Sequence, residues 1–150
     1  MTRPRFVPAG ESDAPEIVAM MRELYELDGY GYDGARALEA VCALLRDPRF
    51  GRIWLIHAEE PEPVGYVVLT LGYSLEFHGR DAFLDELYVR EPHRGRGVGT
   101  AAIAVVEEAC RELGVGALHL EVERRNVRAA ELYRRLAYVD HDRFLMTKRL

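Results

Sequence analysis

Apolar residues recur along the first third of the chain at the spacing of amphipathic helices. The first set is Ile17, Met20, Met21, Leu24 and Leu27, and the second is Leu38, Val41, Cys42 and Leu45. Asp13, with Glu16 three residues later, is typical of a helix N-terminus, and Asp47-Pro48 is a helix stop. This pattern predicts two helices joined by a glycine- and tyrosine-rich loop over residues 29–34, with a short strand before them at residues 5–7.

The middle of the chain predicts strands. Apolar and aromatic runs at residues 53–56, 64–76 and 82–89 are separated by turn sequences at 60–63 and 78–80. Such consecutive strands with short turns indicate an antiparallel meander.

The pattern changes again after residue 96. A helix is predicted from Gly97 to Leu113, with Gly114 beyond its end, then a strand over 117–122, a short helix capped by Asn126 and ending near Leu136, and strands at 138–139 and 144–148. The resulting order, βααβββαβαββ, predicts a single α+β domain over residues 1–150, with a mixed, mostly antiparallel central sheet flanked by helices. Its one strand–helix–strand unit should be parallel with a right-handed crossover.

Composition narrows the function classes. The net charge of −5 argues against a general nucleic-acid binder, and no apolar run approaches the length of a transmembrane helix. The first residues do not resemble a signal peptide, and the two cysteines read as buried thiols of a reducing compartment. We therefore expect a cytoplasmic protein without membrane or nucleic-acid partners. The histidines show no metal-ligand spacing, so no metal is expected.

The segment Arg94-Gly95-Arg96-Gly97-Val98-Gly99 joins the end of a strand to the start of a helix. Its glycines, its two arginines and the unpaired amides of a helix N-terminus are suited to a pyrophosphate. A glycine-rich helix entry without a ligand is the plain alternative.

Two other phosphate loops fit less well. A P-loop would need a lysine between Gly99 and Thr100. A dinucleotide-binding loop is approximated by Gly97-x-Gly99-x-x-Ala102, with Glu121 or Glu123 as its acid. Seven intervening residues, 90–96, one strand–helix–strand unit and the preceding antiparallel meander oppose that interpretation.

Arg94-x-x-Gly97-x-Gly99, directly after Leu87-Tyr88-Val89, resembles motif A of the GNAT family of N-acetyltransferases. The resemblance covers nearly the whole chain, and "LDELYV" is similar to the polyamine- and diamine-acetyltransferase branch. It implies a GNAT-type fold and an acetyl-CoA-dependent N-acetyltransferase that moves the acetyl group by direct attack in a ternary complex.

The resemblance also implies roles for individual residues. Strand residues Leu87, Tyr88 and Val89 would bind the pantetheine arm, with the backbone of Leu87 and Val89 pairing like an added strand. The amides of Arg94, Gly95, Arg96, Gly97, Val98, Gly99 and Thr100 would hold the pyrophosphate. Asn126 matches an asparagine near the cofactor arm, and Tyr133 matches a tyrosine that faces the cofactor sulfur. From the helix pattern alone, Tyr133 reads as a core residue.

Acetyl transfer requires a neutral amine. An alkylamine of pKa about 10.4 is neutral roughly once in 2,000 molecules at pH 7, so a base should help. Asp85 and Glu86 are the candidates. As neighbours on a strand they are expected to point to opposite faces, so that only one faces a given cleft. The branch resemblance aligns Asp85 with the base, acting directly or through water, and leaves Glu86 to attract substrate. An amide near Val89 is the candidate oxyanion donor.

Tyrosines and carboxylates suited to an ammonium group cluster around the first helix–helix loop. The candidate substrate-binding residues are Tyr25, Asp28, Tyr30 and Tyr32, with Tyr73 and Glu76 on the long strand. We expect a small-molecule primary amine as the acceptor. A protein N-terminus or lysine as acceptor, and a non-catalytic CoA-binding sensor, are the alternatives. A homodimer is implied only by the family resemblance.

Overall fold

A computed structural model describes residues 3–150 of the chain. Two compact units are present, one extending through Leu120 and the other comprising Glu121–Leu150. Among the helices of the described residues, none combines the length and apolarity needed to cross a bilayer.

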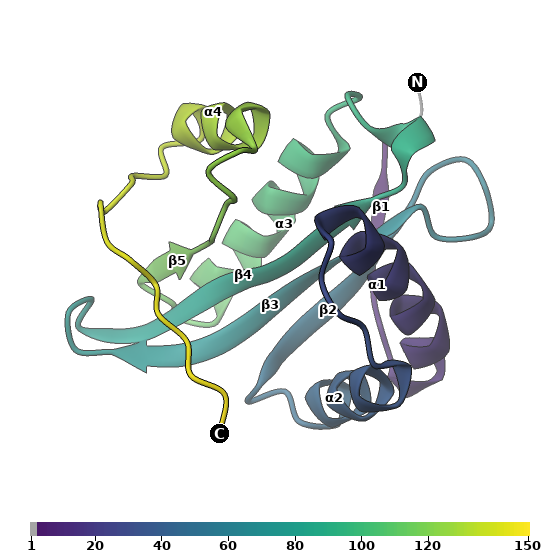
Figure 1. The fold of residues 1–150 in the computed structure, drawn as a ribbon, viewed down its shortest axis with the longest axis horizontal. Helices are drawn as coiled ribbons and strands as arrows, with labels where there is room; N and C mark the ends of the chain where they lie inside the picture. The colour runs from purple at the N-terminus through teal and green to yellow at the C-terminus, as the bar shows by residue number, and fades with distance from the viewer. Residues whose placement is uncertain (1–2) are drawn as a thin grey trace. The chain divides into compact units, whose positions relative to one another are not determined.

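The first unit is built on a five-stranded sheet (Figure 1). Its strands are β1 (Arg5–Pro8), β2 (Gly51–His57), β3 (Gly65–Ser74), β4 (Gly79–Val89) and β5 (Ala117–His119). They lie in sequence order, antiparallel except for the parallel pair β4–β5. The predicted mixed, mostly antiparallel sheet and the parallel strand–helix–strand unit are confirmed.

Helices α1 (Ala14–Asp28) and α2 (Gly34–Arg46) cover one face of this sheet (Figure 1). Their buried residues Ile17, Met20 and Val41 pack in one cluster with Tyr66, Tyr88 and other residues of β2–β4. Helix α3 (Val98–Glu112) contacts β4. The buried residues of α3 are Val98, Ala102, Ile103 and Val106, together with Ala109 and Cys110. They are suited to pack on the other face of the sheet, where side-chain alternation places the buried residues Val67 and Leu69. Two 3₁₀ turns, Glu11–Asp13 and Glu91–His93, precede α1 and α3.

A β-bulge interrupts the pairing of β3 with β4. Val68 pairs with Glu86, whereas the next residue, Leu69, pairs with Leu84. Asp85 is therefore the extra residue of β4, and the strand changes its side-chain alternation there. Leu84 consequently joins Leu69 on the face opposite Glu86.

One edge of β4 is open beyond its first residues. β5 pairs with β4 only at Asp81–Phe83. The Arg90 amide donates to the Val64 carbonyl on the β3 side, at 2.8 Å. Since backbone groups alternate in direction along a strand, Leu87 and Val89 turn theirs away from β3, towards the open edge.

The second unit contains α4 (Val127–Arg135), whose N-cap Asn126 accepts a hydrogen bond from the Ala129 amide, as predicted. The expected strands at 138–139 and 144–148 are absent from residues 136–150, and β5 ends at His119 rather than at residue 122. Left-handed backbone at Ala137 (φ 69°) and Asp142 (φ 50°) interrupts any extended run. The Asp142 amide donates to the Asp140 side chain, a local turn that competes with strand pairing. The predicted element order thus holds as far as α4.

Candidate active site

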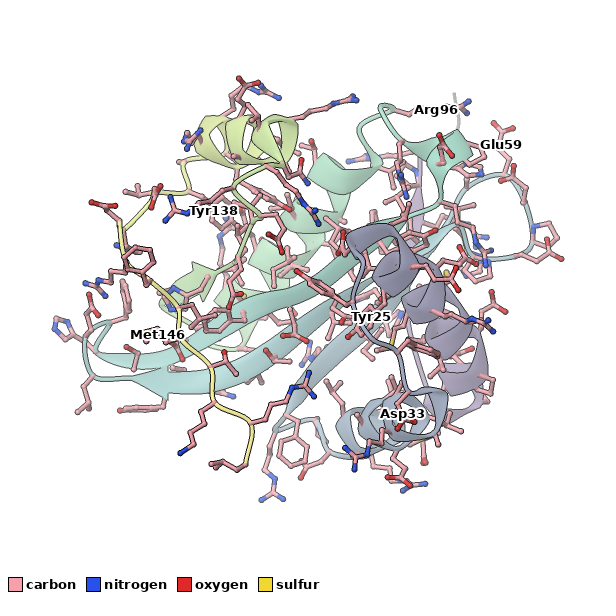
Figure 2. The ribbon with its side chains drawn as sticks, viewed as in Figure 1. Tyr25, Asp33, Glu59, Arg96, Tyr138 and Met146 are labelled. Carbon is pink, nitrogen blue, oxygen red and sulfur yellow. The ribbon has the colours of Figure 1, made fainter. Side chains whose placement is uncertain are left out.

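The centre of the candidate site is the carboxylate of Glu86, which two tyrosines hold. Tyr25, reaching over the sheet from α1 (Figure 2), donates its hydroxyl to Oε2 at 2.6 Å. Tyr66 of β3, fully buried, donates to Oε1 at 2.7 Å. Both oxygens of Glu86 therefore accept a phenol hydrogen.

Burial and charge shift the titration of these three groups. Burial raises the pKa of Glu86, whereas the hydrogen bonds from Tyr25 and Tyr66 lower it. Burial and the Glu86 carboxylate raise the pKa of both phenols. The tyrosines therefore remain protonated donors at any physiological pH.

The β-bulge at Asp85 removes the basis for expecting the two acids to face opposite ways, because strict side-chain alternation does not hold at a bulge. The charge of Asp85 raises the pKa values of Glu86, Tyr25 and Tyr66, all on the face covered by α1. Asp85 is exposed, and partial desolvation raises its pKa.

The predicted phosphate loop has the geometry of an anion cradle. Gly95 and Gly97 adopt left-handed backbone at φ 73° and 79°, which favours glycine. The first bond of α3 runs from the Ala101 amide to the Gly97 carbonyl, so the amides of residues 98–100 precede it without helical partners.

Gly99 gives this cradle a second feature. It has ordinary backbone, and a Cβ added there would meet no heavy atom within 4 Å. Nothing in the described protein requires glycine at this position, but a closely approaching ligand would. The open amides and this free space fit the pyrophosphate of a coenzyme A thioester.

Arg94 links this loop to the open edge of β4. Its Nε donates to the Val89 carbonyl at 2.6 Å, and its guanidinium lies 5.7 Å from the Tyr88 ring centroid. Arg94 therefore occupies an edge acceptor that an extended pantetheine arm could use.

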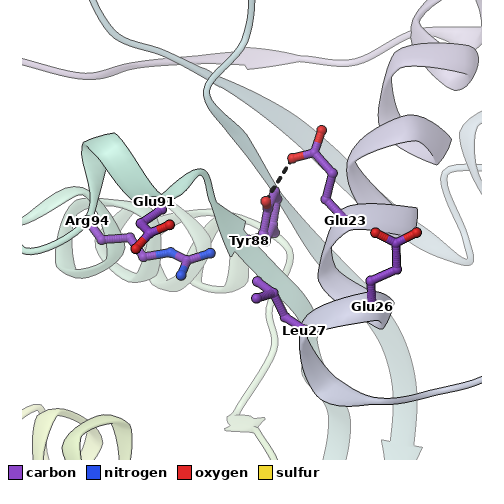
Figure 3. Close-up of a pocket in the computed structure, with 6 residues that line it drawn as sticks. All are labelled: Glu23, Glu26, Leu27, Tyr88, Glu91 and Arg94. Carbon is purple, nitrogen blue, oxygen red and sulfur yellow. Dashed lines mark hydrogen bonds between the residues drawn. The ribbon is translucent and has the colours of Figure 1, made fainter.

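A pocket of about 320 Å³ lies between α1 and the start of this loop (Figure 3). Its lining residues are Glu23, Glu26, Leu27, Tyr88, Glu91 and Arg94. Glu23 accepts from the Tyr88 hydroxyl at 2.7 Å and from Arg90 Nε and Nη2 at 3.1 and 2.8 Å. This ion pair fixes α1 to the end of β4.

The structure groups some of the candidate substrate-binding residues and separates others. Tyr25 packs edge-to-face with Tyr30 and Tyr32, at centroid distances of 6.2 and 5.9 Å. The charge of Asp28 raises the pKa of Glu86. The Tyr32 hydroxyl donates to the Val18 carbonyl, so Tyr32 stabilises the fold.

Tyr73 and Glu76 lie apart from this group. Tyr73 has the alternation of Leu69 and Leu71, which places it on the opposite face from Glu86. It is also five residues along β3 from Val68, the partner of Glu86, a distance of roughly 17 Å. Glu76 lies in the turn beyond β3. The structure therefore does not bring this pair together with Tyr25.

Asn126 and Tyr133 belong to the second unit. Asn126 caps α4, and Tyr133 on that helix packs edge-to-face with Tyr138 at 5.9 Å. Burial raises the pKa of the Tyr133 phenol. Their predicted roles towards the cofactor stay predictions.

Sequence reasoning missed Tyr66 and the Glu23–Arg90 pair. The alternation of β3 marked Tyr66 only as a strand residue, and no local signal connects it with Glu86, 20 residues later. Glu23 and Arg90 are 67 residues apart, so only the tertiary fold reveals their contact.

Comparisons with known proteins agree with this geometry. The sequence model of the acetyltransferase (GNAT) family matches residues 18–138. The thialysine N-epsilon-acetyltransferase of Mus musculus is 30% identical over 151 residues, covering 93% of this chain and 86% of that protein. A solved integron cassette protein from the mobile metagenome of Cole Harbour Salt Marsh is 39% identical, with a TM-score of 0.85 over 97% of this chain and 90% of its own. An aminoglycoside N-acetyltransferase solved in complex with CoA shares the fold, with a TM-score of 0.82 at 14% identity, over 99% and 96% of the two chains.

Proposed function

Because the chain belongs to the acetyltransferase (GNAT) family and is an N-acetyltransferase, we propose that it transfers acetyl from acetyl-CoA to a primary amine of a small molecule. The observation that carries this proposal is the pair of adjacent carboxylates Asp85 and Glu86 on β4, of which Glu86 is held by two tyrosines. That strand continues into the open edge at Val89 and the amide cradle of residues 95–100, whereas the Arg94 amide donates to the Glu91 carbonyl at 3.1 Å.

Acetyl-CoA supplies an acetyl group activated as a thioester. The amides of residues 95–100 would bind its pyrophosphate, and the edge groups of Leu87 and Val89 would pair with its pantetheine arm. A backbone amide near Val89 would stabilise the negative charge that develops on the acetyl oxygen.

Asp85 and Glu86 would act on the acceptor. Their negative charge attracts an ammonium group, and Asp85 removes a proton so that the nitrogen lone pair can attack the acetyl carbon. Tyr133 is assigned to protonate the leaving thiolate, an assignment that rests on the family motif. An ordinary thiol pKa is near 8.5, so this help is modest.

Two features support a small-molecule acceptor with an amine on a flexible chain. The mouse relative is named for the N-epsilon position of thialysine. The group formed by Tyr25, Asp28 and Glu86 combines aromatic faces with carboxylates, which suits a compact cation. The free thiols Cys42 and Cys110 agree with a reducing compartment, and we infer a cytoplasmic enzyme.

A thiol-release assay tests the proposal. Wild type with acetyl-CoA should release CoA in the presence of thialysine, lysine, diamines or polyamines, and less with peptides. The same assay compares Glu86→Gln with Glu112→Gln. The second variant removes an exposed carboxylate on α3 and serves as the matched control. Release only with peptides would favour a protein acetyltransferase. Tight CoA binding without release for any amine would indicate a sensor and contradict the proposal.

A further inference from the structure

Glu86 and Asp85 are chemically unequal although they are neighbours on β4. Glu86 accepts one phenol hydrogen on each oxygen, and its donors come from two elements, Tyr25 from α1 and Tyr66 from β3. Asp85 is exposed, and no hydrogen bond or ion pair to its carboxyl is found within residues 3–150.

Resting on the proposed function, we propose that Tyr25 and Tyr66 are positioning residues that hold Glu86 as a fixed anion beside Asp85, which leaves Asp85 to take the proton of the acceptor amine.

The donor arrangement selects the charged form of Glu86. A carboxylate offers lone pairs to both phenols at once, whereas a protonated carboxyl must itself donate and would leave one phenol poorly paired. For Tyr66 the loss would be severe, because a fully buried hydroxyl without an acceptor is costly. Burial of Glu86 acts in the opposite direction and favours its protonated form.

The charged groups around Glu86 all bear on this balance. Asp28 of α1 and Asp85 of β4 raise its pKa, and the two phenols lower it. Tyr32 acts only on Tyr25, whose pKa it raises. When two carboxylates share one proton, the proton resides on the acid without donors, which is Asp85.

The proton transfer balances without another reactant. An N–H bond of the acceptor ammonium breaks, an O–H bond forms on Asp85, and the freed nitrogen lone pair attacks the acetyl carbon. The fixed charge on Glu86 disfavours a second negative charge beside it, so it increases the affinity of Asp85 for that proton.

Titration of Glu86 in the unliganded protein tests directly whether Tyr25 and Tyr66 hold its carboxyl in the charged form. With glutamate labelled at the carboxyl carbon, the resonance lost in Glu86→Gln identifies Glu86 by NMR. Tyr25→Phe and Tyr66→Phe should each raise its pKa by about one unit, the effect of losing one hydrogen bond to a charged group. Tyr25 is the second variant because it is less deeply buried than Tyr66. An unchanged or lowered pKa of Glu86 in both folded variants would overturn the proposal.

The pH–rate profile tests the consequence for catalysis. In both phenylalanine variants the acidic limb of kcat/KM should move to higher pH, and the same substitutions should add no shift in a Glu86→Gln background. An equal shift in that background would show that the tyrosines do not act through Glu86. The NMR titration needs no substrate, so it tests the roles of Tyr25 and Tyr66 independently of the proposed function. A protein that acetylates no amine would refute the proposed function and leave the result of the titration unaffected.

Discussion

The Nε of Arg94 donates a hydrogen bond to the Val89 carbonyl at 2.6 Å, across the open edge of β4. If the pantetheine arm pairs with that edge, Arg94 must leave this carbonyl when the cofactor binds. Arg94→Ala is therefore expected to bind acetyl-pantetheine more tightly than wild type and 3′,5′-ADP about tenfold more weakly, because a charged phosphate contact is lost. Isothermal titration with the two fragments measures both changes. Weaker binding of acetyl-pantetheine by Arg94→Ala would show that the contact does not compete with the arm.

Gly99 separates ligand approach from protein stability. Its backbone is ordinary and its Cβ position is open, so Gly99→Ala should leave the folded state intact or stabilise it by up to about 0.5–1 kcal/mol. The methyl group should nevertheless weaken acetyl-CoA binding at least about tenfold by obstructing the cradle. Gly114→Ala is the control, since φ 69° at that position predicts a loss of about 1 kcal/mol without a change in affinity. Undiminished acetyl-CoA affinity in Gly99→Ala would show that the pyrophosphate does not bind at this turn.

Asp85→Asn should lower kcat/KM for amine acetylation about a hundredfold or more, the usual contribution of a positioned base. It should also raise Tm at pH 7. Desolvation raises the pKa of Asp85 above 3.8 in the folded state, so its ionisation destabilises the fold as the pH rises through that raised pKa. The stability difference should vanish below pH 3.8, where Asp85 is protonated in both states. Thermal melts across this range check the sign, and a variant less stable than wild type at pH 7 would contradict it.

Tyr133→Phe should reduce kcat about ten- to a hundredfold without abolishing activity, because the thiolate is a fair leaving group. The KM for acetyl-CoA should change little, since only the hydroxyl is removed. Single-turnover measurements separate the chemical step from product release, so the loss should be largest there. Unchanged single-turnover rates would assign Tyr133 to packing alone.

The Glu23–Arg90 pair should contribute to stability at neutral pH. Hydrogen bonds from Arg90 hold the pKa of Glu23 below its usual 4.5, so the contribution is present above pH 4.5 and is lost as the pH falls through the lowered value. Glu23→Gln should lower the free energy of unfolding by about 1 kcal/mol at pH 7. The effect is no larger because both side chains are about a third exposed and solvent partly screens the pair. Glu26→Gln removes the exposed Arg22–Glu26 pair on the same helix and should leave urea unfolding unchanged. Equal unfolding midpoints for the two variants would contradict this assignment.

Local patterns determined most of the fold and one half of the site. Periodicity placed α1, α2 and α3, and the Asn126 cap placed α4, because each of these signals lies within a few neighbouring residues. The glycine spacing after Val89 marked the loop of left-handed glycines before α3 for the same reason, and its phosphate-binding role stays a prediction. The predicted cap at Asp13 was wrong in detail, since its carboxylate accepts from the Gly10 amide and makes no capping bond to α1. The strands expected after Leu136 were wrong, since strand formation depends on a partner edge and on local turns such as the one at Asp140–Asp142.

The acceptor half of the site depended on the tertiary structure. Alternation alone predicted Asp85 and Glu86 on opposite faces, and only the register shift against β3 reveals the bulge that breaks this alternation at Asp85. The contacts of Glu86 with Tyr25 and Tyr66 span 61 and 20 residues, so no local pattern could reveal them. The sequence determined where the donor phosphates are expected to bind, because that feature is contiguous in the chain. That Glu86 is the carboxylate held by two tyrosines was decided by packing between α1, β3 and β4.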